Sequence, residues 1–201
     1  LLLSSAASDV YKRQALNEII DIIKSSKKPI IIGGHGIWWS KNEDLLKQVG
    51  DEIKIPIFNV PYHQKLLNEN CKAFLGLADV HQYHPSKFAF NESDCIIMVG
   101  GRLDNQMNFG NPPLFPASSR LICVNGSHEE IEFNRAADDL LLSDPGAFFE
   151  GLLKSHNRDK FSLEKDWLAK NIGERKKWVT ASLNNLVETT NSPAWSGGKI
   201  H

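Results

Sequence analysis

Three short apolar runs that each end in glycine constrain the fold of this chain more than any other sequence feature. With the residues that end them, they are Ile30–Ile32 with Gly33-Gly34, Cys95–Val99 with Gly100-Gly101, and Leu121–Val124 with Asn125-Gly126. Apolar runs without alternating polar positions are typical of strands buried on both faces, as in a parallel sheet covered by helices. The chain therefore needs helical segments between these strands.

The residues between the runs carry helix signals. An apolar face at helical spacing predicts a helix from Ala15 to about Lys28, where Pro29 ends it. Ser40 is placed to cap a second helix over 41–52. Pro145 favours the start of a third helix that runs to about Lys154.

Two further apolar runs, Ile55–Phe58 and Leu140–Leu142, are strand candidates, whereas residues 62–79 are irregular and are expected to hold a turn of helix. Strands that alternate with helices predict an α/β fold, a doubly wound parallel sheet of about five to six strands with helices on both faces. Residues 162–190 predict a C-terminal helical arm, and residues 191–201 are expected to be a linker.

The charge and cysteine content exclude several function classes. The 201 residues include 23 basic and 24 acidic ones, a net charge of −1, which gives no electrostatic basis for binding nucleic acid. No apolar run approaches the roughly 18 residues of a membrane-spanning helix, so no membrane association is expected. Three cysteines, Cys71, Cys95 and Cys123, without CxxC spacing disfavour disulfides and zinc and favour a reducing, cytoplasmic location.

Residues 1–14, LLLSSAASDVYKRQ, have no clear period and lack the features of a signal peptide. We expect them to be a non-native or disordered leader outside the fold, although an ordinary frayed N-terminus accounts for them equally well. The sequence as a whole looks like a piece of a longer protein.

The glycine-ended strands predict where a ligand binds. Open parallel sheets bind ligands at the carboxyl ends of their strands, where the strand order reverses, and glycines let a backbone approach a phosphate there. Gly33-Gly34-His35-Gly36 is such a loop, but its spacing is not the dinucleotide fingerprint GxGxxG, and a tight strand-to-helix turn explains it as well. Arg102 is placed to contact a phosphate or to pair with Asp104 at the surface. Asn125 is placed to contact a ribose.

Other chemistry is not indicated by the sequence. His81 and His84 stand three residues apart, but Tyr83 and Pro85 interrupt the segment and no further ligand stands at metal spacing. The nucleophile motif GxSxG is absent. Trp38-Trp39 is expected to be core or an interface plug.

The motifs resemble a known family. In chain order they are GGHGIWWS (Gly33–Ser40), IIMVGGRLDNQMNFG (Ile96–Gly110), EEIEFNR (Glu129–Arg135) and Asp144. Together they resemble the central domain of thiamine diphosphate-dependent enzymes, in the acetolactate synthase-like branch with oxalyl-CoA decarboxylase, 2-hydroxyacyl-CoA lyase and benzaldehyde lyase. The resemblance implies a Rossmann-like central domain over 15–155. It also implies that residues 156–201 are a helical connector and linker toward a pyrophosphate-binding domain outside this chain.

The resemblance implies a parent enzyme of three α/β domains that assembles as a homodimer or homotetramer. Thiamine diphosphate and Mg²⁺ would lie between the first and third domains of that parent, and these two domains would be the partners of the present one. The GDG signature of the third domain is missing, because the only Gly-Asp pair, Gly50-Asp51, is followed by Glu52. No catalytic or metal-binding residue is therefore expected in this chain, and whether it is itself an enzyme is left open.

In this family the central domain holds FAD in acetolactate synthases, ADP in oxalyl-CoA decarboxylase and no nucleotide in several other members. By position, the candidate cofactor-binding residues are Gly34, His35, Gly36, Gly101, Arg102, Asn125 and Asp144.

Three departures from the family pattern weaken this nucleotide site. His35 replaces a third glycine, so its side chain is expected to intrude where the backbone should approach a phosphate. The strand end 124–127 reads Val-Asn-Gly-Ser and lacks the family's acidic pair, and Ser143 replaces the glycine before Asp144. They favour a structural domain without nucleotide over one that binds FAD or ADP.

Three functions are compatible with these observations. The first is a scaffolding central domain of a thiamine diphosphate enzyme that cleaves or forms C–C bonds in 2-keto acids or 2-hydroxyacyl substrates, with the fragment itself inactive. The second is a stand-alone module that binds FAD, ADP or NAD. The third is an interaction domain without a ligand, whose arm over 162–190 docks on a partner.

Overall fold

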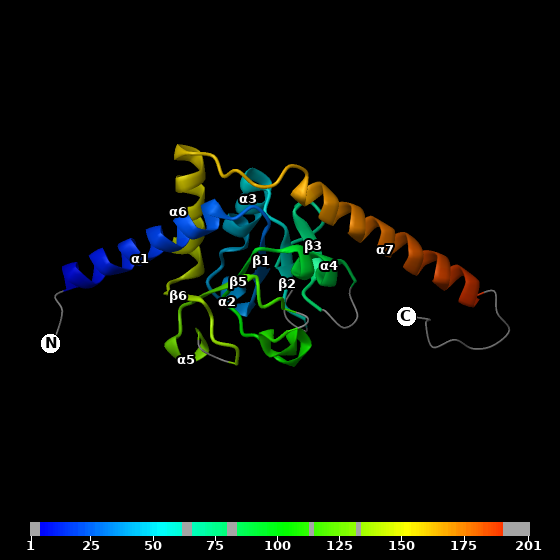
Figure 1. The fold of residues 1–201 in the computed structure, drawn as a ribbon, viewed down its shortest axis with the longest axis horizontal. Helices are drawn as coiled ribbons and strands as arrows, with labels where there is room; N and C mark the ends of the chain where they lie inside the picture. The colour runs from blue at the N-terminus through cyan, green and yellow to red at the C-terminus, as the bar shows by residue number, and fades with distance from the viewer. Residues whose placement is uncertain (1–4, 62–65, 80–83, 113–114, 132–133, 191–201) are drawn as a thin grey trace.

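Six parallel strands form one sheet in the computed structural model, which describes residues 5–61, 66–79, 84–112, 115–131 and 134–190 (Figure 1). The strands are β1 (Pro29–Gly33), β2 (Ile57–Asn59), β3 (Phe74–Leu77), β4 (Cys95–Val99), β5 (Arg120–Asn125) and β6 (Asp139–Leu142). Their spatial order is β3-β2-β1-β4-β5-β6, and every neighbouring pair is parallel. The chain therefore winds outward in one direction from β1 and in the other from β4, which confirms the doubly wound fold and places the switch point between β1 and β4.

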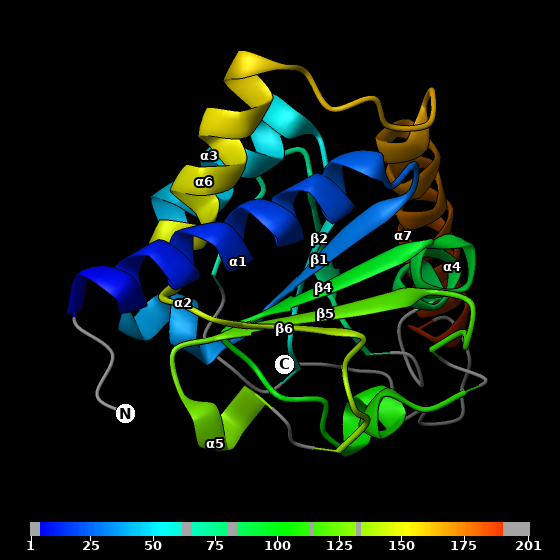
Figure 2. The same cartoon turned by 60° about the vertical axis from the view of Figure 1, so that its left-hand side comes forward.

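Helices cover both faces of the sheet (Figure 2). They are α1 (Ser5–Ser25), α2 (His35–Trp39), α3 (Glu43–Ile53), α4 (His84–Glu92), α5 (His128–Ile131), α6 (Pro145–Arg158), α7 (Trp167–Thr190) and the 3₁₀ helix η1 (Asn105–Gly110). Helices α1, α3 and α6 supply buried side chains to one core layer. Helices α4 and α7 supply them to the other.

The two core layers explain why the strands show no polar alternation. Ile31 and Ile97 belong to the layer under α1, α3 and α6, whereas Ile30, Ile32 and Ile96 belong to the layer under α4 and α7. Successive side chains of a strand point to opposite faces, so each face needs its own apolar set. All five residues are fully buried.

Two helix starts differ from the prediction. Helix α1 begins at Ser5, ten residues before the expected Ala15, so the leader from residue 5 onward is helical. Good helix formers such as Ala, Lys, Arg and Gln in this segment extend the helix without needing an apolar period. Helix α3 begins at Glu43 after Asn42, not after Ser40. Ser40 instead ends α2, where its hydroxyl donates to the carbonyl of Gly36 at 2.8 Å.

Strand β3 and helix α4 were not predicted, and neither were the short helices α2, η1 and α5. Strand β3 lies inside the segment expected to be irregular, and Gly76 interrupts its apolar pattern with a φ of +116° at an irregular register with β2. Helix α4 starts at His84. Pro85 therefore stands in its first turn, where proline is tolerated. The arm begins as a helix only at Trp167, five residues later than expected.

The three cysteines lie buried and unpaired. Burial raises the pKa of the Cys95 and Cys123 thiols to about 12, and it also raises the pKa of Cys71.

Within the described ranges, no helix is long and apolar enough to cross a membrane.

Candidate functional site

The carboxyl ends of β1 and β4 bring the two glycine loops together at the switch point. Gly34 and Gly36 follow β1, and Gly100 and Gly101 follow β4. The parallel pairing of β1 with β4 places Gly33 opposite Val99, so the loops leave the sheet side by side. These glycines, predicted from the sequence as one ligand-binding edge, are neighbours in the structure.

The backbone amides of these loops bond to the protein's own carbonyls. Gly34 N–H donates to Val99 O at 2.8 Å, and Gly36 N–H donates to Gly100 O at 2.7 Å. Gly100 N–H donates in turn to Val124 O at 2.8 Å. A glycine loop that cradles a phosphate directs its amides at the ligand. Here the amides of Gly34 and Gly100 extend the sheet ladder by one step, and the amide of Gly36, in α2, bonds to the loop after β4.

The glycines are required by the close approach of the two loops. A Cβ added to Gly34 would lie 2.3 Å from the Cα of Gly101, and one added to Gly36 would lie 2.9 Å from the Cα of Gly100. Gly100 also has a φ of +64°, which favours glycine. The two loops therefore pack backbone against backbone, with no room for a side chain at Gly34 or Gly36.

The side chain of His35 packs with the aromatic rings of its own helix α2, with ring centroids 5.2 Å from Trp38 and 5.7 Å from Trp39. The rings of His35 and Trp39 are stacked at 21°. Trp39 is 72% exposed, so it is not a core residue as one interpretation expected, while its role as an interface residue stays a prediction.

Two polar candidates, Arg102 and Asn125, make local structural contacts. Arg102 forms an ion pair with Glu130, with Nε 3.0 Å from Oε2, and both side chains are about half exposed. The Asn125 side chain accepts from Ser127 N–H at 3.1 Å, which closes the turn after β5.

Asp144 caps the N-terminus of α6. Its carboxylate accepts from Gly146 N–H at 2.7 Å, and the Asn42 side-chain amide lies 3.5 Å away. A carboxylate at this position satisfies an amide that the helix leaves open and interacts favourably with the positive end of the helix.

A cavity of about 330 Å³ lies next to these contacts and is lined by Gly36, Trp39, Asn125, Ser127 and Asp144, among others. It unites candidates from the ends of β1, β5 and β6. Gly34, His35, Gly101 and Arg102 do not line it. Trp39, which ends α2, and Ser127, in the turn after β5, also line the cavity and were not among the candidate residues.

In the described part of the chain, no three His, Cys, Asp or Glu side chains lie close enough together to hold a metal ion. Of the two histidines weighed for a metal, His84 begins α4, and His81 lies outside the described residues.

An open parallel sheet with this strand order defines a doubly wound α/β domain, a fold class in which ligand sites lie at the switch point. The chain belongs to a particular family of that class, described as "Thiamine pyrophosphate enzyme, central domain", whose sequence model matches residues 16–152. This match confirms the resemblance found in the motifs.

The chain is similar to several curated proteins at low identity. The chain is 27% identical over 177 residues to a probable acetolactate synthase large subunit of Methanococcus aeolicus, covering 87% of this chain and 28% of the relative. It is 24% identical over 174 residues to 2-hydroxyacyl-CoA lyase 1 of Mus musculus, covering 86% of this chain and 29% of the relative. The yeast mitochondrial acetolactate synthase catalytic subunit is 28% identical over 132 residues, 65% of this chain and 19% of that protein. The chain thus spans less than a third of the length of these relatives.

Proposed function

We propose that this chain is the scaffolding central domain of a thiamine diphosphate-dependent enzyme that cleaves or forms C–C bonds in 2-keto acids or 2-hydroxyacyl substrates. The names of its relatives, acetolactate synthase and 2-hydroxyacyl-CoA lyase, support these two substrate classes. The other two domains of the parent bind thiamine diphosphate and Mg²⁺, and the parent assembles as a homodimer or homotetramer. Three buried free cysteines are in keeping with a reducing cytoplasm.

One observation carries the scaffolding role over a nucleotide-binding role. The amides of Gly34 and Gly36 donate to Val99 O and Gly100 O, so they are not available to a diphosphate. These two amides are therefore not placed to bind the diphosphate of the FAD or ADP that some family members hold there. The β1–β4 pairing joins the two halves of the sheet, and the Gly34–Val99 bond continues it by one step.

A second candidate function rests on the cavity beside the loops. Its volume of about 330 Å³ lies at the lower end of the range for small-molecule sites. The exposed ring of Trp39 is a surface on which a base could stack, and Asn125 and Asp144 offer polar contacts. This cavity suits a nucleoside diphosphate better than the larger FAD.

The fragment alone is expected to be inactive. Catalysis requires a preorganised cofactor site, and the cofactor-binding domains of the parent lie outside these residues. A purified domain mixed with thiamine diphosphate, Mg²⁺ and a 2-keto acid should therefore release no CO₂. Turnover by the purified domain would contradict this part of the proposal.

Calorimetric titration of the chain with FAD, ADP and CoA in turn tests the scaffolding role. We expect no binding heat from any of the three. Micromolar FAD binding would overturn the scaffolding interpretation. ADP binding that Trp39→Ala abolishes would establish the second candidate, with Trp178→Ala on the distant arm as the matched tryptophan control.

A further inference from the structure

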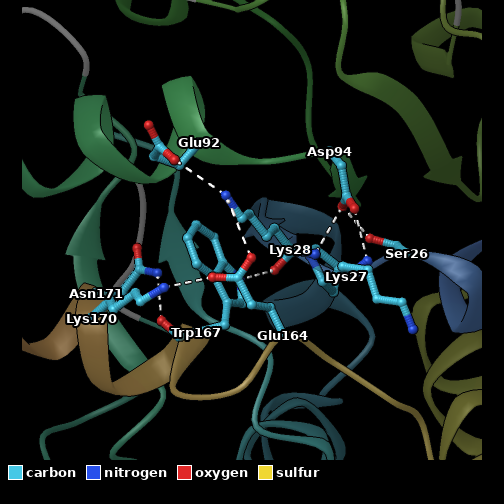
Figure 3. A network of polar contacts seen from close by, with 10 residues as sticks. Ser26, Lys27, Lys28, Glu92, Asp94, Glu164, Trp167, Lys170 and Asn171 are labelled. Atoms are coloured by element: carbon cyan, nitrogen blue, oxygen red, sulfur yellow. Dashed lines mark hydrogen bonds and ion pairs between the residues drawn. The ribbon is translucent and has the colours of Figure 1, made fainter.

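The amino edge of the sheet, opposite the glycine loops, anchors the C-terminal arm (Figure 3). Trp167, the first residue of α7, is 2% exposed and lies in the core layer under α4 and α7. Its indole N–H donates to Pro29 O at 2.9 Å. The arm is therefore bonded to the first residue of β1, a central strand of the sheet.

Lys28 connects three segments around this tryptophan. Its Nζ lies 3.2 Å from Oε2 of Glu92 at the end of α4, and 3.6 Å from Oε2 of Glu164 on the approach to α7. The same ammonium lies 5.9 Å from the centroid of the Trp167 ring. Figure 3 shows Lys28 between the two carboxylates, with Lys170 bonded to Glu164 from the other side at 2.6 Å.

Backbone bonds hold the approach segment against the turn before β1. Glu164 N–H donates to Lys27 O at 2.7 Å, and Lys27 Nζ donates to Ser162 O at 3.0 Å. The turn is itself fixed, because the Asp94 carboxylate accepts from the N–H groups of Lys27 and Lys28 at 2.7 and 3.0 Å and from the Ser26 hydroxyl.

The arm leaves the domain beyond these contacts. Its first turns pack on α4 and β3, and Arg175 lies 3.6 Å from Glu69. From Lys176 to Asn185 the side chains are mostly exposed, and the helix projects from the body of the molecule (Figure 1). Its 24 residues span about 36 Å.

We propose that Lys28, Glu164 and Trp167 form a clamp that makes α7 a rigid strut, so that this domain sets the direction in which the parent chain continues toward its next domain. The inference rests on the proposed scaffolding function and supplies its mechanism. Residues 159–166 between α6 and α7 are non-helical and would otherwise leave the arm free to swing. The clamp ties the start of the helix to the sheet, and the stiffness of the helix carries that fixed direction outward.

Distances between spin labels test the strut directly. Glu150→Cys on α6 and Asn184→Cys on α7 place labels at two exposed positions. The native cysteines are buried, so the two introduced cysteines are expected to be the accessible labelling sites. We expect a single narrow distance distribution from the doubly labelled chain. A broad distribution would overturn the proposal.

Variants of the clamp give the second half of the test. Trp167→Ala should abolish the narrow peak, and Trp167→Phe should keep most of it. Because Trp167→Ala also removes core packing, the double variant Lys28→Met/Glu164→Gln provides a test without a core change and should also broaden the peak. Its matched control, Glu174→Gln/Lys177→Met, removes an ion pair of 2.6 Å within the arm and should leave the distance distribution unchanged.

An unchanged peak in the Lys28→Met/Glu164→Gln variant would show that the charged part of the clamp does not hold the arm, and would contradict the proposal. None of these readouts depends on nucleotide titration. Binding of FAD or ADP would therefore overturn the scaffolding role while leaving the strut to be judged by its own distances.

Discussion

The two edges of the sheet differ in what their polar groups do. At the carboxyl edge, where this class of fold binds ligands, backbone amides of the glycine loops bond to neighbouring strands, and the side chains of Asn125 and Asp144 bond to nearby amides. At the amino edge, the Asp94 carboxylate, the Lys28 ammonium and the Trp167 indole join segments that are far apart in the sequence.

The comparison shows that the position of a ligand site and its ability to hold a ligand are decided by different features. The fold places any ligand site at the switch point, but the local donors decide whether a ligand finds partners there. In this chain the amides of Gly34, Gly36 and Gly100 at the carboxyl edge already bond to backbone carbonyls, and the amino edge is where the domain holds the start of α7.

The largest effect is expected from Gly34→Ala, which would separate the two loops of the carboxyl edge. The new methyl would meet the backbone of Gly100 and Gly101 at 2.3 to 2.5 Å, and backbone cannot rotate away as a flexible side chain can. We expect a loss of about 3 kcal/mol or more in the free energy of unfolding, measured by urea denaturation.

Gly126→Ala is the matched control for that change, because nothing lies within 4 Å of the added methyl. The free energy of unfolding of Gly126→Ala should stay close to that of the unsubstituted chain. A Gly34→Ala protein as stable as Gly126→Ala would show that the loops do not need their close contact.

At the amino edge, Asp94→Ala removes the acceptor for the N–H groups of Lys27 and Lys28. Charge-assisted hydrogen bonds to a carboxylate support an expected loss of about 2 kcal/mol in the free energy of unfolding. Asp51→Ala, which removes only a surface pair with Lys47 on α3, should cost no more than about 0.5 kcal/mol. Equal losses in the two variants would remove the basis for treating the Asp94 turn as an anchor.

Asp144 offers a smaller test at the carboxyl edge. Asp144→Ala removes the cap of α6 and should lower the free energy of unfolding by about 1 kcal/mol. Asp144→Ser keeps a capping oxygen and should therefore retain most of the stability that Asp144→Ala loses. Failure of serine to restore stability would point to a role for the carboxylate beyond capping.

The smallest effect is a pH dependence at His156, on the segment that leads to the arm. Burial lowers the pKa of His156, the charge of Lys160 lowers it further, and Glu52 opposes them. The neutral ring accepts from Phe161 N–H at 3.2 Å through Nδ1. Because the unfolded chain takes up this proton first, near pH 6.5, stability should fall as the pH drops from there toward the lowered folded pKa.

Urea denaturation between pH 7 and pH 5 measures this slope. His156→Asn keeps an acceptor near Phe161 but cannot take up a proton, so its slope should be shallower. An unchanged slope in His156→Asn would assign the pH dependence to other groups.

The sequence predicted the parts of the fold that depend on local pattern. The apolar runs at β1, β4 and β5 and the helix signals of α1 and α6 follow from periodicity and glycine ends. β3 was missed because Gly76 breaks its pattern, and α4 was missed because Pro85 reads as a breaker unless the helix start is known.

The candidate site was predictable in place but not in chemistry. The glycines at 34, 36, 100 and 101 indicate a close backbone approach, which a phosphate or a neighbouring loop satisfies equally well. Only the strand order, with β1 beside β4, shows that the neighbouring loop is the other glycine pair. The clamp left no sequence signal, because Lys28, Glu164 and Trp167 come together only through tertiary packing.

The strands that are apolar on both faces also bear on how the chain finds its register while folding. A slip by one residue exchanges the two faces of a strand, and here both faces would still meet apolar neighbours. Polarity across the sheet therefore discriminates weakly against a slipped pairing of β1 with β4. Interactions at the strand ends distinguish the correct pairing. At one end the Asp94 carboxylate accepts from the N–H of Lys28 in the turn before β1. At the other end the two glycine loops are in close backbone contact. We expect variants at these ends to accumulate misregistered, slowly refolding species even where the native state remains stable.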